Sequence, residues 1–472
     1  MSRAGQVENS AKRDIIPRVR ELVRRNLRFF VLFVVAALGL RLFFILRFPG
    51  VVTDSFIYGD IAKNWLQHGI YGLSGPDEIS PTYIRLPGYP AFLAFIFAIF
   101  GMEHYRAVLV VQMLVDIGTC FLCADIALRL LPRSAKVAFI LAALCPFLAN
   151  YSAAALTETL EVFFTALALD MAVRAFQNQG LRYWAACGAA CGVAMLLRPD
   201  GGLLLIAIET YLIGKFLFQK QSGTSAISRR TLVRAALLVA LISSLPLVPW
   251  ALRNWQVFHH FQPLAPRYAN EEGEFVPRGF NHWVKTWIAD YTSVEEIYWA
   301  VPGNAIDPAK LPSRAFDNPQ QQIATAQSID DYNNLLHISP ELDAKFEAIA
   351  SERIHAHPAR YYLWLPVLRI ADMWLRPRTE MLPSDSRWWE FNDDPKWSVL
   401  AVSLGVINLA YVVCAIMGWI RSRRTALLGL LLLFLIVRSA FLGTLENPEP
   451  RYTLEMYPVV IVLAAALAGR KI

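Results

Sequence analysis

The sequence has few residues of the kinds that hold a fold together through covalent bonds or metal ions. There are 6 cysteines and 8 histidines among 472 residues. All six cysteines lie in apolar runs, and spacings such as Cys120-x-x-Cys123 have no histidine or further cysteine nearby. We therefore expect small buried packing residues, which carry no information on redox compartment. The pairs His259-His260 and His355-x-His357 lack an adjacent acid or cysteine pattern, so no metal site is predicted.

The sequence also lacks the small-residue cleavage site of a secretory signal, and its first apolar run is long for one. The basic stretch before that run, Lys12 to Arg28, is therefore predicted to be a cytoplasmic flank that can contact anionic lipid. Internal repeats and low-complexity tracts are absent as well.

Apolar residues dominate the composition. They make up 56% of the chain, charged residues only 18%, and the mean hydropathy is +0.38. These values are typical of a polytopic membrane protein and exclude an ordinary soluble domain. A spanning helix needs about 20 apolar residues, and the sequence predicts an all-α protein with about ten such helices. The ten runs lie near residues 27–48, 105–131, 136–155, 157–177, 183–199, 201–218, 232–252, 397–419, 425–444 and 453–469.

The net charge of +7 is concentrated in short loops between these runs. Positive charge in short loops marks the cytoplasmic side and argues against a nucleic-acid partner. We therefore predict a multi-pass protein of the plasma (inner) membrane with both termini in the cytoplasm. The basic groups are Arg129, Arg133 and Lys136; Arg174 and Arg182; Lys215, Lys220, Arg229, Arg230 and Arg234; Arg421, Arg423 and Arg424; and Arg470 with Lys471.

Four parts follow from this topology. They are a basic cytoplasmic N-terminus (1–26), a transmembrane catalytic module with a first outer loop at 49–104 (27–252), an extracytoplasmic segment (253–396) and C-terminal transmembrane helices (397–472). The apolar run 87–101 is short for a span, so we interpret it as a re-entrant or juxtamembrane helix. Within the extracytoplasmic segment we expect helices near 318–336 and 340–356, and an interfacial helix at 358–376.

The first outer loop contains the strongest candidate residues. Asp54 follows the first span and Arg85 precedes a Pro-Gly-Tyr-Pro turn. A carboxylate and a guanidinium at a bilayer edge suit chemistry on a lipid-borne anionic substrate. The alternative for Asp54 is a helix N-cap, a position that Asp fills well. Asp60 is a lesser candidate that we expect on a solvated helix face.

Glu158 is the second candidate carboxylate, at the outer start of a predicted span with Glu161 one turn further on. A carboxylate at membrane depth is costly and indicates function. The alternative is an acid favoured by the positive end of the helix dipole.

Two further arginines, Arg198 and Arg451, lie at outer helix ends and suit forked hydrogen bonding of phosphate. Their alternative role is to anchor the chain at the membrane interface. Partners could not be assigned to the intramembrane residues Asp116, Asp125, Asp170, Glu209 and Arg438.

Five short motifs occur in a fixed order along the chain. They are Asp54 with Tyr58, Arg85-Leu-Pro-Gly-Tyr-Pro90, Leu156-Thr-Glu158, Leu197-Arg-Pro199 and Glu449-Pro-Arg-Tyr452. With these motifs in this order, the chain resembles bacterial members of the GT-C superfamily of glycosyltransferases. The most similar members are the family-39-like protein O-mannosyltransferases and the aminoarabinose transferase of lipid A. The resemblance covers residues 50–255 and, less fully, the C-terminus.

The resemblance implies an inverting transfer of a sugar from a polyprenyl-phosphate donor to an acceptor glycan, lipid or protein on the outer face. It implies Asp54 as the base or acceptor-orienting carboxylate, Glu158 as the second-loop acid and Arg451 as a candidate for the donor phosphate. The expected substrate-binding residues are Tyr58, Arg85, Tyr89, Arg198, Arg451 and Tyr452, with the lipid-linked donor in place of a cofactor. Ser55 follows Asp54 where several relatives have a second acid, which weakens a case for protein mannosylation.

The alternative function is a polytopic transporter or lipid flippase. Such folds are built from paired repeats with broken helices in matching positions. The sequence shows no such repeats, and its candidate residues lie at outer helix ends.

Overall fold

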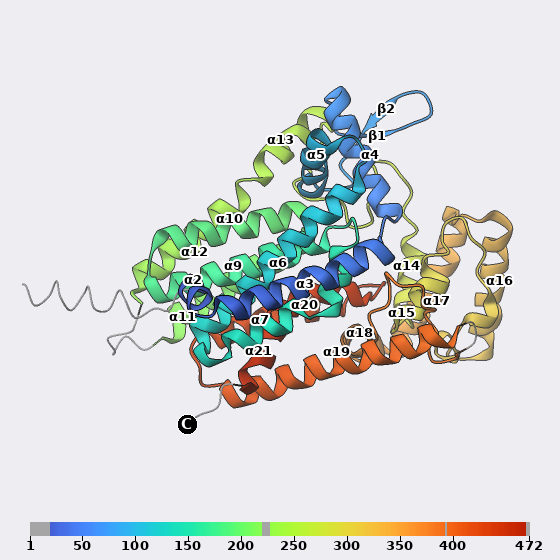
Figure 1. Cartoon of the computed structure of the whole chain (residues 1–472). Helices are drawn as coiled ribbons and strands as arrows, with labels where there is room; N and C mark the ends of the chain where they lie inside the picture. Colours follow the sequence, from blue (N-terminus) through green and yellow to red (C-terminus); the bar gives the residue numbers. More distant parts are fainter. Residues whose placement is uncertain (1–18, 220–226, 392–393, 469–472) are drawn as a thin grey trace, which may run out of the picture. The chain divides into compact units, whose positions relative to one another are not determined.

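The computed structural model describes residues 19–219, 227–391 and 394–468. The expected basic N-terminus lies mostly outside the described residues, as do Lys220, Arg470, Lys471 and both termini. The described chain consists of helices joined by loops, with one short two-stranded hairpin (Figure 1). It divides into two compact units. Unit 1 consists of Met1–Ala269, Ala410–Leu435 and Glu455–Ile472, and unit 2 of Asn270–Leu409 and Ile436–Leu454.

The all-α polytopic class is confirmed. Six helices of the described chain are long and apolar enough to cross a membrane, or seven if one bent pair counts as a span. The six are Leu27–Arg47, Tyr105–Leu130, Pro199–Phe218, Arg229–Phe258, Pro395–Ser422 and Pro450–Ala468, and the bent pair is Pro132–Ala143 with Pro146–Ser152. The three other expected spans are also helical but shorter or less apolar, so the count of ten stays a prediction.

Unit 1 contains most of the apolar helices. Its helices are α2 (Val19–Arg25), α3 (Leu27–Arg47), α4 (Thr53–His68), α5 (Gly88–Phe100), α6 (Tyr105–Leu130), α7 (Ala135–Ala143), α8 (Pro146–Ser152), α9 (Glu158–Asn178), α10 (Leu181–Leu197), α11 (Gly202–Phe218), α12 (Arg229–Ser244), α13 (Leu247–Phe258) and α21 (Tyr457–Ala465). The strands β1 (Gly72–Ser74) and β2 (Ile79–Pro81) pair antiparallel in the first loop. Helices α19 (Pro395–Ser422) and α20 (Leu428–Leu442) each have residues in both units.

A buried ion pair fixes the break between α7 and α8. Arg41 of α3 is fully buried and its Nε lies 2.6 Å from Asp116 Oδ2 of α6. Its guanidinium also donates to the carbonyl oxygens of Ala142 and Ala143, at 3.2 and 2.7 Å. These carbonyls are at the end of α7, where a helix leaves acceptors without intrahelical partners. The Arg41 guanidinium therefore supplies hydrogen-bond donors both to the buried Asp116 carboxylate and to the carbonyl oxygens at the end of α7.

Asp125 and Asp170, two further intramembrane acids of unit 1, also find partners. Asp125 of α6 lies 2.7 Å from Arg129 and 2.5 Å from Arg174, and Asp170 of α9 lies 2.9 Å from Arg174. Two acids and two arginines therefore join α6 to α9, as buried charges require. Glu209 differs, because its buried Oε1 has no hydrogen-bond partner among the described residues.

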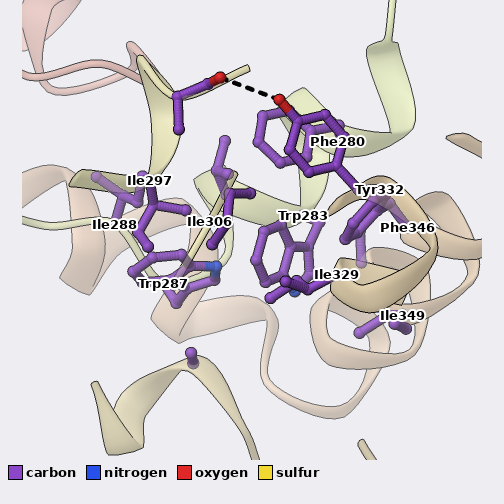
Figure 2. Packing of buried hydrophobic residues seen from close by; sticks show 14 of the residues in the cluster. Phe280, Trp283, Trp287, Ile288, Ile297, Ile306, Ile329, Tyr332, Phe346 and Ile349 are labelled. Atoms are coloured by element: carbon purple, nitrogen blue, oxygen red, sulfur yellow. Dashed lines mark hydrogen bonds between the residues drawn. The ribbon is translucent and has the colours of Figure 1, made fainter. Parts of the chain in front are cut away.

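Unit 2 has its own aromatic core, shown in Figure 2. Its helices are α14 (Arg278–Lys285), α15 (Tyr291–Ser293), α16 (Pro319–Leu335), α17 (Pro340–Ala356) and α18 (Leu365–Leu375). Trp283, Trp287 and Phe346 are at most 1% exposed. Tyr332 donates to the Ala300 carbonyl oxygen at 3.0 Å. Helices α16, α17 and α18 confirm that the segments expected near 318–336, 340–356 and 358–376 are helical.

Candidate functional site

Asp54 lies in the first turn of α4 but does not cap it. The N-cap residue is Val52, whose N–H donates to Ser55 Oγ at 3.0 Å. The N-cap alternative for Asp54 is therefore wrong. Asp54 Oδ1 instead accepts a hydrogen bond from Arg85 Nη2 at 3.0 Å, with 35% of its side chain exposed. The structure thus pairs the two charged residues that bracket the first loop.

Tyr58 follows Asp54 by one turn of α4 and connects this pair to α5. The Arg85 guanidinium lies 5.7 Å from the centre of its ring. Its ring packs edge-on against Tyr89, with centroids 5.1 Å apart. Tyr89 is fully buried and donates to Gln112 Oε1 at 2.7 Å. Gln112 was not predicted, because a single glutamine inside an apolar run carries no recognisable signal.

Backbone hydrogen bonds tie the start of the first loop to the segment before Glu158. Gly50 N donates to Ala153 O and Ala155 N donates to Gly50 O, each at 2.8 Å. Gln112 Nε2 reinforces this junction by donating to Ala154 O at 2.6 Å. Gly50 precedes Asp54 by four residues and Ala154 precedes Glu158 by four. Two carboxylates far apart in sequence are therefore held in neighbouring segments.

Glu158 is the first residue of α9 and is 4% exposed. Arg198 Nη1 lies 3.9 Å from Glu158 Oε1, while its Nε lies 3.6 Å from Glu161 Oε1 and 3.1 Å from Asp200 Oδ1. A position at a helix start also suits an acid electrostatically, so the dipole alternative and a functional role are compatible. Asp200 was not predicted, although it directly follows the Arg198-Pro motif.

Gly88 brings the first loop against the end of α10. A Cβ atom at this position would lie 2.6 Å from the Leu196 carbonyl oxygen, which is closer than real contacts allow. Only glycine permits this approach of backbone to backbone. Because Leu196 is two residues before Arg198, the turn that follows Arg85 lies beside the segment that carries Arg198.

The charged groups described above also act on the phenol of Tyr58. Burial raises the pKa of Tyr58 to about 12, and the charges of Arg85, Asp54, Arg198 and Glu158 all act on its phenol. Both ion pairs therefore lie near a single hydroxyl. We call Asp54, Tyr58, Arg85, Tyr89, Glu158 and Arg198 the first-loop site.

Asp60 has a structural place rather than a solvated one. Its carboxylate accepts from Ser74 N and Ser74 Oγ at 2.7 and 2.8 Å, and it pairs with Lys63 at 3.3 Å. Burial opposes ionisation, but these hydrogen bonds and the Lys63 charge lower the pKa of Asp60 overall. Asp60 thus anchors the β1–β2 hairpin to α4 (Figure 1).

Arg253 of α13 holds the other end of the hairpin. It donates to the carbonyl oxygens of Thr82 and Tyr71, both at 2.7 Å. Its guanidinium also lies 5.3 Å from the centres of the Tyr71 and Trp250 rings. In the sequence, only the aromatic residues near Arg253 could have indicated this role. They are equally typical of residues that anchor a helix at the membrane interface.

Arg451 and Tyr452 form a local cluster with Glu449 in unit 2. Arg451 Nε lies 2.5 Å from Glu449 Oε2, and Tyr452 donates to Glu449 Oε1 at 2.6 Å. Asn447 Nδ2 donates to the same Glu449 oxygen at 3.3 Å. The described residues contain no group of three His, Cys, Asp or Glu side chains arranged to hold a metal ion.

Residues 81–250 match the family described as dolichyl-phosphate-mannose-protein mannosyltransferase. The matched range contains Arg85, Glu158 and Arg198 and lies within unit 1. This match confirms, for residues 81–250, the predicted resemblance to GT-C glycosyltransferases. Among curated proteins, no sequence matches this chain.

Solved structures show a loose likeness in helix arrangement. The oligosaccharyltransferase of Archaeoglobus fulgidus, in complex with Zn and sulfate, is 15% identical with a TM-score of 0.49. That likeness covers 93% of this chain but 48% of the other, so this chain spans about half its length. ArnT from Cupriavidus metallidurans in the apo state is 16% identical with a TM-score of 0.38, covering 91% of this chain and 77% of that one.

Proposed function

We propose that the protein is a membrane glycosyltransferase that moves a sugar from a polyprenyl-phosphate donor to an acceptor at the first-loop site. The observation that carries this proposal is that the backbone contacts of Gly50 hold the segments of Asp54 and Glu158 side by side, with the charges of both acids acting on the phenol of Tyr58. The match to a family named for a dolichyl-phosphate sugar supports the class of donor.

The two arginines of the site suit different tasks. Arg198 lies within 3.9 Å of three carboxylates, so it serves to hold Glu158 in place. Arg85 is paired with Asp54 and is 20% exposed. A phosphate group that enters beside Arg85 can compete with Asp54 for its forked donors. Arg85 is therefore the group that we assign to the donor phosphate in unit 1.

The reaction needs one proton transfer and one departing phosphate. Asp54, released from Arg85, accepts the proton of the acceptor hydroxyl or amine as that oxygen or nitrogen attacks the anomeric carbon. The bond from the anomeric carbon to the phosphate oxygen breaks, and Arg85 stabilises the negative charge that grows on the phosphate. A single displacement of this kind inverts the anomeric configuration.

The experiment is a transfer assay with the purified full chain and a panel of polyprenyl-phosphate sugars, measuring acceptor-dependent release of polyprenyl phosphate. We expect at least one donor to react and Arg85→Gln to lower kcat/KM about 10²-fold. The matched control is Arg106→Gln, an exposed arginine at the start of α6, which should react like the wild type. Absence of release from every donor, or full activity of Arg85→Gln, would contradict the proposal.

We place the site on the outer face of the plasma membrane, with the loops at Lys136 and Arg229 in the cytoplasm. The support is the positive charge of those short loops. Labelling of single cysteines in a background without the native cysteines tests this: position 136 should react only from the inside and position 77 only from the outside. The reverse pattern would move the first-loop site to the cytoplasmic face.

A further inference from the structure

A cavity of unit 2 lies between α18 and the first half of α19. Its volume is about 800 Å³, which is in the range of small-molecule sites. Residues of both helices line it, and the side chains of Trp388 and Trp389 are at its border. Helix α19 is long and apolar enough to cross a membrane. One wall of the cavity therefore belongs to a helix that is expected to lie in lipid.

Helix α19 is fixed to the end of α18 beside this cavity. Asn408 is fully buried and donates to Trp374 O at 2.7 Å and to Arg376 O at 3.2 Å. Both carbonyl oxygens lie at the C-terminal end of α18, where a helix leaves acceptors without intrahelical partners. One turn earlier on α19, a Cβ atom at Gly405 would lie 3.1 Å from Pro377 Cγ. The cavity walls are thus set by a defined contact between the two helices.

Apolar side chains of these walls remain exposed in the folded chain. Their exposed fractions lie between 37% and 62%, and the residues are Leu368, Leu375, Val402, Val406 and Leu409. Such surface is unfavourable in water and is covered by hydrocarbon in a bilayer. The walls therefore match the acyl chain of a lipid.

Four charged residues also line the cavity, namely Asp290, Arg314, Asp372 and Arg376. Asp290 is paired with Arg314, and Arg376 Nη1 lies 3.9 Å from Asp372 Oδ1. The four formal charges sum to zero, so the cavity favours neither a simple anion nor a simple cation. A ligand that carries one charge of each sign fits this balance.

Arg314 keeps one nitrogen available for an anionic group. Its Nε donates to Trp287 O at 3.1 Å, and its Nη2 donates to Asp290 and to Ser293 Oγ. Its Nη1 donates to none of the residues that the structure describes, and 43% of the side chain is exposed. Because a guanidinium binds phosphate oxygens well, Nη1 can receive the phosphate of a lipid headgroup.

Asp372 keeps one oxygen available for a cationic group. Its Oδ2 accepts from Tyr291 N at 3.0 Å, whereas the 3.9 Å between its Oδ1 and Arg376 exceeds hydrogen-bond distance. Burial raises the pKa of Asp372 to about 6, and the charge of Arg376 opposes this while that of Asp290 adds to it. The carboxylate is thus ionised at neutral pH, and its Oδ1 can accept from an ammonium group.

We propose that this cavity binds one glycerophospholipid whose headgroup carries both a phosphate and an ammonium group, as phosphatidylethanolamine does. One acyl chain packs on the apolar walls, the phosphate accepts from Arg314 Nη1, and the ammonium group donates to Asp372 Oδ1. The indoles of Trp388 and Trp389 lie at the border, and tryptophan is common at the depth of lipid headgroups. This lipid site does not depend on the transfer reaction proposed above.

The headgroup part of the proposal is tested on the wild type. The full chain is purified in detergent and titrated with phosphatidylethanolamine or with phosphatidylglycerol, and bound lipid is measured by native mass spectrometry. Phosphatidylglycerol has the phosphate but no ammonium group, so its Kd should be about tenfold higher, as loss of a charge-assisted hydrogen bond predicts. Equal Kd values for the two lipids, or no retained phosphatidylethanolamine, would overturn the proposal.

Asp372→Asn locates the ammonium contact. The amide oxygen can still accept from Tyr291 N, but the charge is lost, so the preference for phosphatidylethanolamine over phosphatidylglycerol should disappear. The matched control is Asp331→Asn, an exposed acid of unit 2 that pairs with Lys345 at 2.7 Å; it should keep the preference. A folded Asp372→Asn variant that keeps the full preference would contradict the proposed contact.

Val406→Trp fills the cavity from α19 and should raise the Kd of phosphatidylethanolamine about tenfold or more. Val399→Trp is the control, since Val399 is 58% exposed two turns earlier on α19 and lies outside the cavity lining. Thermal unfolding shows whether each variant folds; if Val406→Trp does not, the two-lipid comparison still decides. Unchanged binding by folded Val406→Trp would mean that only adventitious lipid surrounds the chain. Tighter binding of a polyprenyl phosphate, lost in Val406→Trp, would give the cavity to that lipid and overturn the proposal.

Discussion

Two aspartate–arginine pairs in unit 1 have the same chemistry and opposite surroundings. Arg41 and Asp116 are 0% and 2% exposed and approach to 2.6 Å, whereas Arg85 and Asp54 are 20% and 35% exposed and approach to 3.0 Å. The first pair is closed to any substrate and shares its donors with the end of α7. The second pair can exchange its partner for a ligand. Burial, rather than residue type, separates a structural pair from a candidate catalytic one.

The largest expected effect is on the buried pair. Arg41→Met leaves Asp116 buried without its partner, which should lower stability by roughly 3–5 kcal/mol. The measurement is thermal unfolding in detergent, with Arg47→Met on the exposed end of the same helix as the control. The double variant Arg41→Met/Asp116→Leu should recover much of the loss, because no uncompensated charge remains. Stability of Arg41→Met equal to that of Arg47→Met would show that the buried pair does not hold the break between α7 and α8.

Glu158 combines features of the two pairs. It is buried, as Asp116 is, yet it belongs to the first-loop site, as Asp54 does. We expect Glu158→Gln to lower kcat/KM about 10²-fold, while the isosteric amide keeps the packing at the start of α9. Transfer and unfolding should be measured on the same preparation. The control is Glu103→Gln, an exposed acid that pairs with Lys63 at 3.3 Å. A variant with unchanged transfer would make Glu158 an electrostatic partner of the helix dipole only.

Unit 2 contains a further arginine–acid pair, Arg451 with the buried Glu449, that can be compared with the two pairs of unit 1. If it clamps the donor phosphate, Arg451→Lys keeps the charge but loses the planar fork. Loss of such a hydrogen bond costs about 1.5–3 kcal/mol, or about ten- to a hundredfold in kcat/KM. Transfer at varied donor concentration measures this. Near-normal kcat/KM for the lysine variant would make Arg451 an interfacial anchor, since lysine also snorkels.

The smallest effect concerns Asp60, whose role is to hold the hairpin. Its folded pKa lies below its unfolded value, so its contribution to stability is present above the unfolded pKa and is lost as pH falls through the folded pKa. Asp60→Asn should destabilise the protein by about 1 kcal/mol at neutral pH. The difference in stability between wild type and variant should begin to shrink as the pH falls below about 3.9, the ordinary pKa of aspartate. A difference that stays constant down to the lowest pH at which the protein remains folded would show that the contribution of Asp60 does not depend on its ionisation.

Periodicity and apolar length were enough to predict the helical membrane class, because the bilayer imposes both. The order of short motifs was enough to place Asp54, Arg85, Glu158 and Arg198 as candidates. Sequence alone could not reveal the junction of Gly50 with Ala154, because backbone pairing leaves no side-chain signature. Nor could it show that Asp54 pairs with Arg85 instead of capping α4, since both roles use the same carboxylate. The pairing of Asp116 with Arg41 likewise depends on a contact distant in sequence.

The central claim is that the exposed pair takes part in the reaction, and Asp54→Asn tests it most directly. The amide keeps the size of the side chain and removes the base, so transfer from a purified polyprenyl-phosphate sugar should fall by at least about 10²-fold. The unfolding midpoint should stay near that of the wild type. Asp77→Asn, in the exposed turn of the same loop, should retain full transfer. Transfer by Asp54→Asn at a substantial fraction of the wild-type rate would contradict the account and leave Asp54 as a structural partner of Arg85.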